Sequence, residues 1–363
     1  MEASPHCAAE KKYRNIAPWL LHCVGLPGDK FKSKKSCQKS RLSKDTGVTF
    51  NSIPAVCFLP RSQNLVTSEF ATPKFPECRI QILDKKGKLL NSFPTEVERR
   101  GSSTFGVSPA SDDDSYIAAC TGRGVAIWST EGKLVANMTS DDVQNCCHIT
   151  HMKCGLLATT CITDMRGRCV TLWDQRSGKI VSQFASRPEI VELNPLKATQ
   201  KIIIRNNHIR LPWFLTSNSK DEIFISDRNS KCIKVFDTRN QRYIKCFDTS
   251  GFDTRVKKSI VPQGLCTDEN ENLIVMDSNT KSLLLFDPKG SFIRPLTRKA
   301  EFDLYGEPWA IAMTTSPQFH RPICRSKCRG NDNARTLAVS MATPKPAVGI
   351  YKLSFCPHYT SYV

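Results

Sequence analysis

The chain has 363 residues, 40% of them hydrophobic, so it is long and apolar enough to bury a sizeable core and is not disordered throughout. Its 52 Lys and Arg outnumber its 34 Asp and Glu, and the resulting net charge of +18 favours anionic partners, nucleic acid first. No uninterrupted apolar run reaches the roughly 18 residues of a transmembrane helix, so we expect no membrane partner.

Residues 1–46 are expected to form a flexible basic N-terminal segment. Within it, DKFKSKKSCQKSRLSKDT at 29–46 has almost no large apolar residue after Phe31 and cannot bury enough surface to become ordered. Three roles stay open for this segment: RNA binding, nuclear import through residues 30–44, or an inert linker. Residues 11–28 faintly resemble a signal peptide, but Pro18 and His22 interrupt the apolar run and no A-x-A-like site follows.

The 17 cysteines predict free thiols rather than a disulfide framework. Their number is odd, Cys146 and Cys147 are adjacent, and others such as Cys57 and Cys120 lie inside apolar runs typical of strands. This usage indicates a reducing compartment, so we expect a cytoplasmic protein, with nuclear entry through 30–44 as the variant.

Residues 47–363 are expected to form one six-bladed β-propeller, an all-β fold. A pattern of short alternating strands and polar turns recurs most clearly at 223–247 and 273–293. Weaker copies cover 65–93, 116–138, 156–184 and 336–355. A repeat of roughly 45 residues with about four strands is a propeller blade. The third strands end at Leu83, Trp128, Trp173, Phe236, Phe286 and Tyr351.

Short strands, several opened by proline, precede the repeats and are expected to line the centre of the ring. They lie at 52–58, 211–215, 261–266 and 307–312. Long spacings predict insertions at 185–210, as an extra strand or a binding loop, and at 315–335. We expect the closing blade to combine strands from both ends of the chain.

The copies at 223–247 and 273–293 resemble the NHL repeat. The shared pattern is a strand ending in Asp, a polar turn, an Ile-x-Val-Phe-Asp-like strand and a glycine turn. The matching residues are Asp227, Ile233, Val235, Phe236 and Asp237, then Asp277, Leu283, Leu285, Phe286, Asp287 and Gly290, with the Pro-x-Gly opening at Pro262 and Gly264. The resemblance to NHL propellers of the brain-tumour and tripartite-motif group implies single-stranded RNA binding in post-transcriptional regulation and translational repression. The chain shows no RING, B-box or coiled-coil pattern, so ubiquitin-ligase activity is not implied.

One face of the expected ring collects the turns between second and third strands and the links between blades. Cations there would attract a phosphate backbone, and aromatic side chains could stack on bases or simply pack in the core. The candidate RNA-binding residues are Lys74, Arg79, Arg123, Arg166, Arg168, Arg205, Arg210, Arg228, Lys231, Arg255, Lys257 and Lys281, with Phe75, Trp213 and Trp309 for stacking. The alternative is a protein-interaction scaffold that uses the same face, as an adaptor linked to ubiquitin-ligase assemblies.

Neither a metal site nor a cofactor is expected. The segment CCHITHMKC at 146–154 has zinc-binding residue types, but its spacing fits no finger or ribbon, and the Cys324-x3-Cys328 pair lacks nearby partners. Calcium-dependent propeller hydrolases hold their metal on inner-strand carboxylates, and the inner strands here read as apolar. Together with the absence of hydrolase and phosphate-loop motifs, this predicts that the chain is not an enzyme and has no small-molecule substrate.

Overall fold

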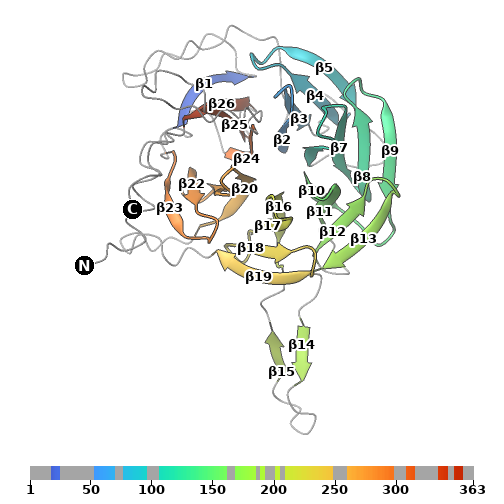
Figure 1. Cartoon of the computed structure of the whole chain (residues 1–363), viewed down its shortest axis with the longest axis vertical. Coiled ribbons are helices and arrows are strands. Elements are labelled where there is room, and N and C mark those ends of the chain that lie inside the picture. The colour runs from blue at the N-terminus through green and yellow to red at the C-terminus, as the bar shows by residue number, and fades with distance from the viewer. Residues whose placement is uncertain are drawn as a thin grey trace, which may run out of the picture.

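The computed structural model contains six four-stranded antiparallel sheets arranged as blades around one axis (Figure 1). It describes residues 18–24, 53–69, 77–95, 106–161, 168–184, 189–192, 201–204, 209–247, 260–297, 308–314, 334–341 and 347–354. The predicted all-β six-bladed propeller is confirmed. Over these ranges no helix was found that could serve as a membrane span.

The first three blades follow one another from the inner to the outer strand. Blade I is β2 (Ala55–Phe58), β3 (Leu65–Glu69), β4 (Arg79–Leu83) and β5 (Leu89–Pro94). Blade II is β6 (Val107–Pro109), β7 (Tyr116–Thr121), β8 (Gly124–Ser129) and β9 (Leu134–Thr139). Blade III is β10 (Cys146–His151), β11 (Leu156–Cys161), β12 (Cys169–Asp174) and β13 (Lys179–Phe184).

The next two blades repeat the same order. Blade IV is β16 (Pro212–Ser217), β17 (Glu222–Asp227), β18 (Cys232–Asp237) and β19 (Arg242–Phe247). Blade V is β20 (Pro262–Thr267), β21 (Leu273–Asp277), β22 (Ser282–Phe286) and β23 (Phe292–Pro295). Between blades III and IV, β14 (Glu189–Glu192) and β15 (Lys201–Ile204) pair as a separate hairpin that extends away from the ring (Figure 1). The insertion predicted at 185–210 is therefore a strand pair.

Blade VI joins the two ends of the chain. Its strands are β24 (Pro308–Met313), β25 (Ala334–Met341), β26 (Ala347–Ser354) and β1 (Pro18–Val24), and β1 pairs antiparallel with β26 from Pro18↔Leu353 to Val24↔Val348. The expected mixed closing blade is thus observed. The expected arm, 1–46, needs correction at 18–24, because the apolar run there adds a strand to an otherwise open sheet edge.

The core lies between the blades. All six predicted third-strand residues are buried, with Trp173, Leu83 and Phe286 each at 0% exposure. Gly87, Gly132, Gly178 and Gly290 in the outer hairpins all have positive φ, as their turn positions predict. A Cβ at Gly290 would also stand 2.4 Å from the ring of Phe247 in the neighbouring blade.

The inner strands β2, β6, β10, β16, β20 and β24 contact one another in sequence and close a ring. At two of these contacts the neighbouring backbones touch. A Cβ on Gly264 of β20 would lie 2.7 Å from the backbone nitrogen of Ile311 on β24, and one on Gly106 would lie 2.7 Å from the Cα of His148. Glycine at these positions therefore lets adjacent blades approach closely at the centre.

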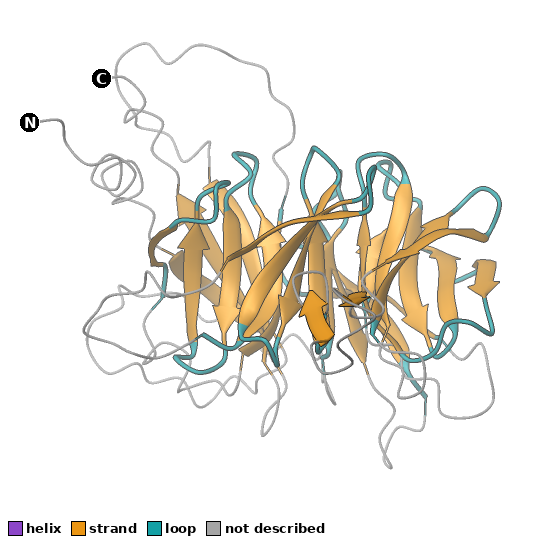
Figure 2. Cartoon of the chain, turned by 90° about the horizontal axis from the view of Figure 1, so that it is seen from below, coloured by secondary structure: helices purple, strands orange, loops and turns teal. Residues whose placement is uncertain are grey.

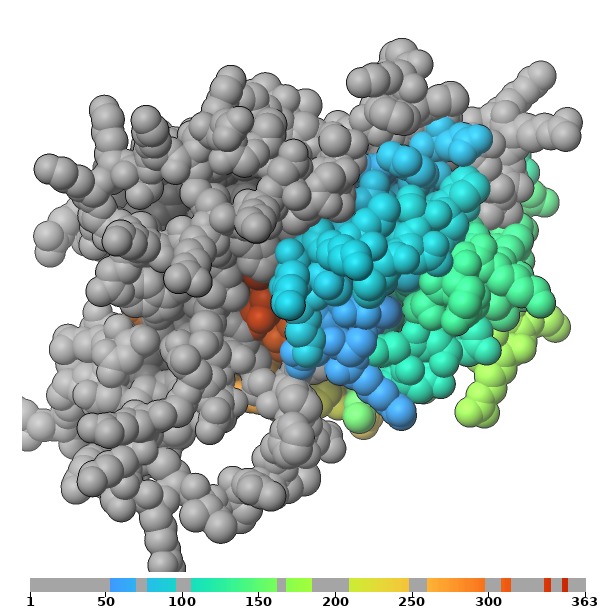
Figure 3. Space-filling view, turned by 90° about the horizontal axis from the view of Figure 1, so that it is seen from above, coloured from blue at the N-terminus to red at the C-terminus, as the bar shows by residue number. Residues whose placement is uncertain are grey.

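The outer strands of blades I to III form the wall of the ring, coloured blue to green in Figure 3. Several apolar side chains on these strands are exposed, namely Leu89 (42%), Leu90 (52%), Leu134 (46%), Val135 (52%) and Val181 (58%). Since scattered apolar residues are ordinary on protein surfaces, we assign them no role.

Candidate functional site

The two faces of the ring differ in which turns they carry, and Figure 2 shows the strands standing between them. Because neighbouring strands in each blade are antiparallel, the turn from second to third strand lies on the same side as the link to the next blade. We call this side the linking face and the other the opposite face. The RNA-binding residues predicted from the sequence belong to the linking face.

Blades IV and V build the linking face in the same way. In blade IV, buried Asp227 accepts hydrogen bonds from the backbone nitrogens of Arg210 (2.9 Å) and Leu211 (2.8 Å) and from the hydroxyl of Ser230 (2.7 Å). The turn and the interblade link are thereby tied to one carboxylate, which holds Arg210 and Arg228 at neighbouring points of the face.

Asp277 does the same in blade V. It accepts from the backbone nitrogens of Val261 (2.8 Å) and Thr280 (3.1 Å), and the Thr280 hydroxyl also donates to it. The acidic residue that carries the NHL resemblance is therefore a structural anchor for the linking face. At the end of the second strand, an aspartate can reach both the following turn and the link to the preceding blade. This accounts for the recurrence of Asp at this position of the repeat.

The carboxylate of Asp227 is also balanced electrically. The Lys234 ammonium lies 3.0 Å from it, and the two side chains are 8% and 0% exposed. Burial alone would raise the pKa of Asp227, but the hydrogen bonds and the Lys234 charge outweigh it and lower the pKa. Asp227 therefore stays ionised, and the positive charge of Lys234 compensates its negative charge.

Lys231 and Lys281 end the two equivalent turns in a left-handed backbone conformation, with φ of 54° and 50°. A non-glycine residue in this region costs roughly 1–2 kcal/mol. Lysine at both positions, where glycine would fit without strain, places a cation at the linking face at the expense of some stability. Lys231 is exposed and Lys281 half-buried.

The structure distributes the remaining candidates unevenly. Arg79 is tied to buried Glu69 at 2.9 Å, so its charge is already compensated, and Arg123 lies 3.6 Å from exposed Asp141. Arg168 follows blade III's second strand on the linking face, where it is half-buried. Lys74, Phe75, Arg166, Arg205, Arg255 and Lys257 lie outside the described residues.

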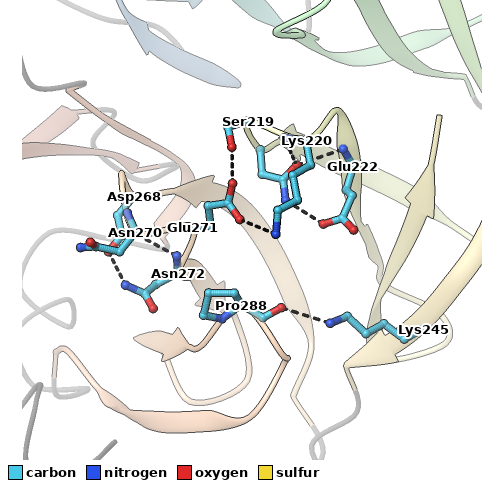
Figure 4. Close-up of polar contacts among 10 residues, drawn as sticks. Ser219, Lys220, Glu222, Lys245, Asp268, Asn270, Glu271, Asn272 and Pro288 are labelled. Atoms are coloured by element: carbon cyan, nitrogen blue, oxygen red, sulfur yellow. Dashed lines mark hydrogen bonds and ion pairs between the residues drawn. The ribbon is translucent and has the colours of Figure 1, made fainter. Parts of the chain in front are cut away.

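The opposite face is more acidic in its turns. Asp112, Asp113 and Asp114 lie between β6 and β7, and the turn between β20 and β21 carries Asp268, Glu269 and Glu271. Figure 4 shows how the latter group is used: Glu271 accepts from the Ser219 hydroxyl and pairs with Lys220 at 3.2 Å, which joins blade IV to blade V. Asp268 closes its own turn through Asn272.

At the ring axis, Trp213 and Trp309 meet edge to face with ring centroids 5.9 Å apart. Both are half-buried and pack against the core, so the two predicted stacking candidates are brought together. Gln263 was not among the predicted residues, yet it follows the opening proline of β20 just as the tryptophans follow those of β16 and β24. That shared spacing is a sequence signal that would have identified it.

Gln263 is 3% exposed, and its Oε1 atom has no hydrogen-bond partner. A buried acceptor left unpaired costs about 1–3 kcal/mol. Such an oxygen can accept a hydrogen bond from a bound molecule.

The segment CCHITHMKC contributes the inner strand of blade III. Buried His148 accepts a hydrogen bond from the backbone nitrogen of Leu215 at 3.5 Å and packs at a tilt against Phe214, with ring centroids 4.7 Å apart. The sulfur atoms of Cys146 and Cys161 lie 3.4 Å apart. Burial raises the pKa of the adjacent Cys147 thiol to about 12. In the described part of the chain, no three metal-binding side chains converge on a point that could hold an ion.

No protein-family model matches the chain, and no curated protein matches it. Its fold is similar to that of a catalytically inactive variant of virginiamycin B lyase from Staphylococcus aureus, solved with quinupristin: 12% identity, a TM-score of 0.51, and coverage of 94% of this chain and 96% of that one. A streptogramin B lyase aligns at 12% identity and a TM-score of 0.47 over 82% of this chain and 78% of that one. A protein of unknown function from Bacteroides caccae aligns at 11% identity and a TM-score of 0.45, over 69% and 83%.

The first of these likenesses corrects the prediction that the chain is not an enzyme, because a lyase has this fold over nearly the whole chain. The premise of that prediction was also incomplete. His148 and His151 lie in the inner strand of blade III, which the sequence pattern does not reveal, and Gln263 is a polar residue within the predicted inner strand 261–266. The chain is a six-bladed β-propeller.

Proposed function

We propose that the chain binds single-stranded RNA on its linking face and acts in post-transcriptional repression in the cytoplasm. One observation carries the proposal: Arg210, Arg228 and Lys231 lie around one anchor, Asp227, and none has a carboxylate partner among the described residues. Cations left unpaired on a rigid frame are suited to phosphate oxygens, whose neutralisation releases counterions.

The frame matters as much as the charge. Long cationic side chains on a mobile loop lose conformational freedom when they bind, whereas here the backbone of the turn is fixed by hydrogen bonds to Asp227 before any ligand arrives. In blade V the equivalent turn, tied to Asp277, carries Lys281 one blade further along. A strand of RNA that follows the face would thus meet cations from successive blades.

The test is a titration of the full chain with fluorescent single-stranded RNA at several salt concentrations. The double variant Arg228→Gln with Lys231→Gln should bind more weakly and show a shallower dependence of log affinity on log salt, by about 0.7 per lost phosphate contact. The matched control removes two cations from the opposite face, Lys153→Gln with Lys289→Gln, and should leave affinity and slope nearly unchanged.

Two results would count against RNA binding. Absence of binding at low salt would exclude it, and equal losses in both double variants would show attraction by net charge alone. If instead an acidic or phosphorylated peptide binds with a shallow salt slope that depends on Arg228, the scaffold alternative becomes the better account of the face.

A further inference from the structure

Three adjacent blades present the same structural device at the ring axis. In β16, β20 and β24 the opening proline is followed by a β-bulge, and the residue after that proline is Trp213, Gln263 or Trp309. A bulge redirects the side chain of the extra residue and is frequent beside functional sites. The position is therefore built in the same way in each blade, although the residue types differ.

The contact between the two indoles shows which way they point. β16 and β24 are not neighbours, since β20 lies between them and contacts both. The outer side of each inner strand is covered by the second strand of its own blade. Because β21 occupies the outer side of β20, we place the contact between Trp213 and Trp309 on the side of β20 that faces the ring axis.

The backbone at both tryptophans lies against a neighbouring blade. The Trp213 carbonyl accepts a hydrogen bond from the Thr160 hydroxyl of blade III at 3.3 Å. The backbone carbonyl of Trp309 lies 2.8 Å from where a Cβ of Gly264 would be, so the two strands are in contact there. In an edge-to-face pair, one ring keeps both of its faces uncovered by the other.

We infer that this constellation binds one nucleobase of the RNA, which stacks on an indole while an N–H of its edge donates to Gln263 Oε1. The inference rests on the proposed function and names the subsite where a base is taken up. The unpartnered Oε1 of Gln263 can accept a hydrogen bond, and an indole offers a surface for stacking. A nucleobase with an N–H at its edge can use both. Arg210 lies two residues before Pro212, so the phosphate of such a nucleotide would reach the cations of the linking face.

The experiment compares binding of the full chain to a short RNA and to the same backbone without bases, and follows tryptophan fluorescence with free nucleoside monophosphates. Gln263→Leu keeps the size of the side chain and removes the unpaired oxygen, so it should fold at least as well as the parent chain. We expect the base-free strand to bind roughly tenfold more weakly, as loss of one stacked base implies. Gln263→Leu removes the hydrogen bond but not the stacking surface, so it should reduce this difference and leave the salt slope unchanged.

Quenching that is lost in Trp213→Phe with Trp309→Phe is assigned to these two indoles, because Trp19, Trp128 and Trp173 all remain in that variant. If the parent chain binds the RNA and the base-free strand equally well, or if Gln263→Leu has no effect, the base site is overturned. Binding of the phosphate backbone of RNA would remain the account of the linking face. Quenching by free nucleotides that the double variant abolishes would support the base site even if long RNA does not bind. Quenching by an arginine peptide but by no nucleotide would overturn it.

Discussion

Asp227 and Asp277 occupy equivalent positions, but only the former has a described buried ion pair, with Lys234 at 3.0 Å. Asp227→Asn would keep the shape of the side chain and remove the negative charge beside a buried ammonium. We expect it to lower the free energy of unfolding by about 3–5 kcal/mol, and Asp277→Asn by about 1–2 kcal/mol because hydrogen bonds alone are weakened. Urea unfolding of both variants checks this, and equal losses would contradict the ion-pair argument.

His148 predicts a dependence of stability on pH. Burial lowers the pKa of His148 to about 4, whereas an unfolded histidine titrates near ~6.5. The unfolded chain therefore binds the proton first, so this contribution to stability is complete above pH ~6.5 and falls as pH drops toward ~4, by up to about 3 kcal/mol.

His148→Gln keeps an acceptor for the backbone nitrogen of Leu215 and removes the titration. Unfolding measured between pH 4 and 7 should show a flatter profile for this variant than for the parent chain. His151→Gln serves as the comparison: burial also lowers the pKa of this half-buried histidine, so we expect its replacement to flatten the profile less than His148→Gln does. A profile that is unchanged by His148→Gln would assign the pH dependence elsewhere.

For single residues, composition and repeat pattern predict positions on the linking face but do not show which of these cations already pair with a carboxylate. Arg79 was chosen by position, and its pairing with Glu69 depends on the register of β3 with β4. Gln263 was passed over because an amide is unremarkable in a sequence. It became informative only when the structure showed that its oxygen is buried and unpaired.

Among the elements, the contact of β20 with β24 depends on Gly264. Gly264→Ala would bring a Cβ to 2.7 Å from the backbone nitrogen of Ile311 and force the strands apart. We expect a loss of about 1–3 kcal/mol in unfolding free energy and a shifted fluorescence spectrum as Trp309 moves. Gly155→Ala is the comparison, since its Cβ meets nothing within 4 Å and only its φ of +87° is unfavourable. A larger loss at Gly155 would contradict this account.

The same scale shows where sequence patterns lose information. Four inner strands were predicted because proline marks the start of a strand at β2, β16, β20 and β24. β6 has only three residues, and β10 begins with two cysteines, so neither carries that mark. β6 and β10 become recognisable only as the inner strands that a closed ring requires in blades II and III. Closure depends on all six blades and leaves no local mark in the sequence.

For the whole molecule, the strand pair β1–β26 closes the ring. Its partners are more than 300 residues apart in the sequence, so no local pattern could reveal them, and the apolar run at 18–24 was assigned to the arm. Deleting residues 1–24 would expose the edge of β26, whereas deleting 1–17 would leave β1 in place. We expect the longer deletion to lower the unfolding temperature and promote association through the open edge.

Calorimetry and sedimentation of the two truncated chains measure these effects. The shorter deletion provides the control for loss of N-terminal residues in general. If both behave alike, β1 contributes nothing to closure.

The closure also imposes an order on biosynthesis. A ribosome makes β1 first and β26 last, so during translation the N-terminal strand has no partner until almost the whole chain has emerged. Meanwhile the growing arc of blades keeps two open ends, and chains with open strand edges associate wrongly at high concentration. Chaperones that shield β1 on the ribosome should therefore raise the yield of folded protein, and a pause in translation before residue 347 should lower it.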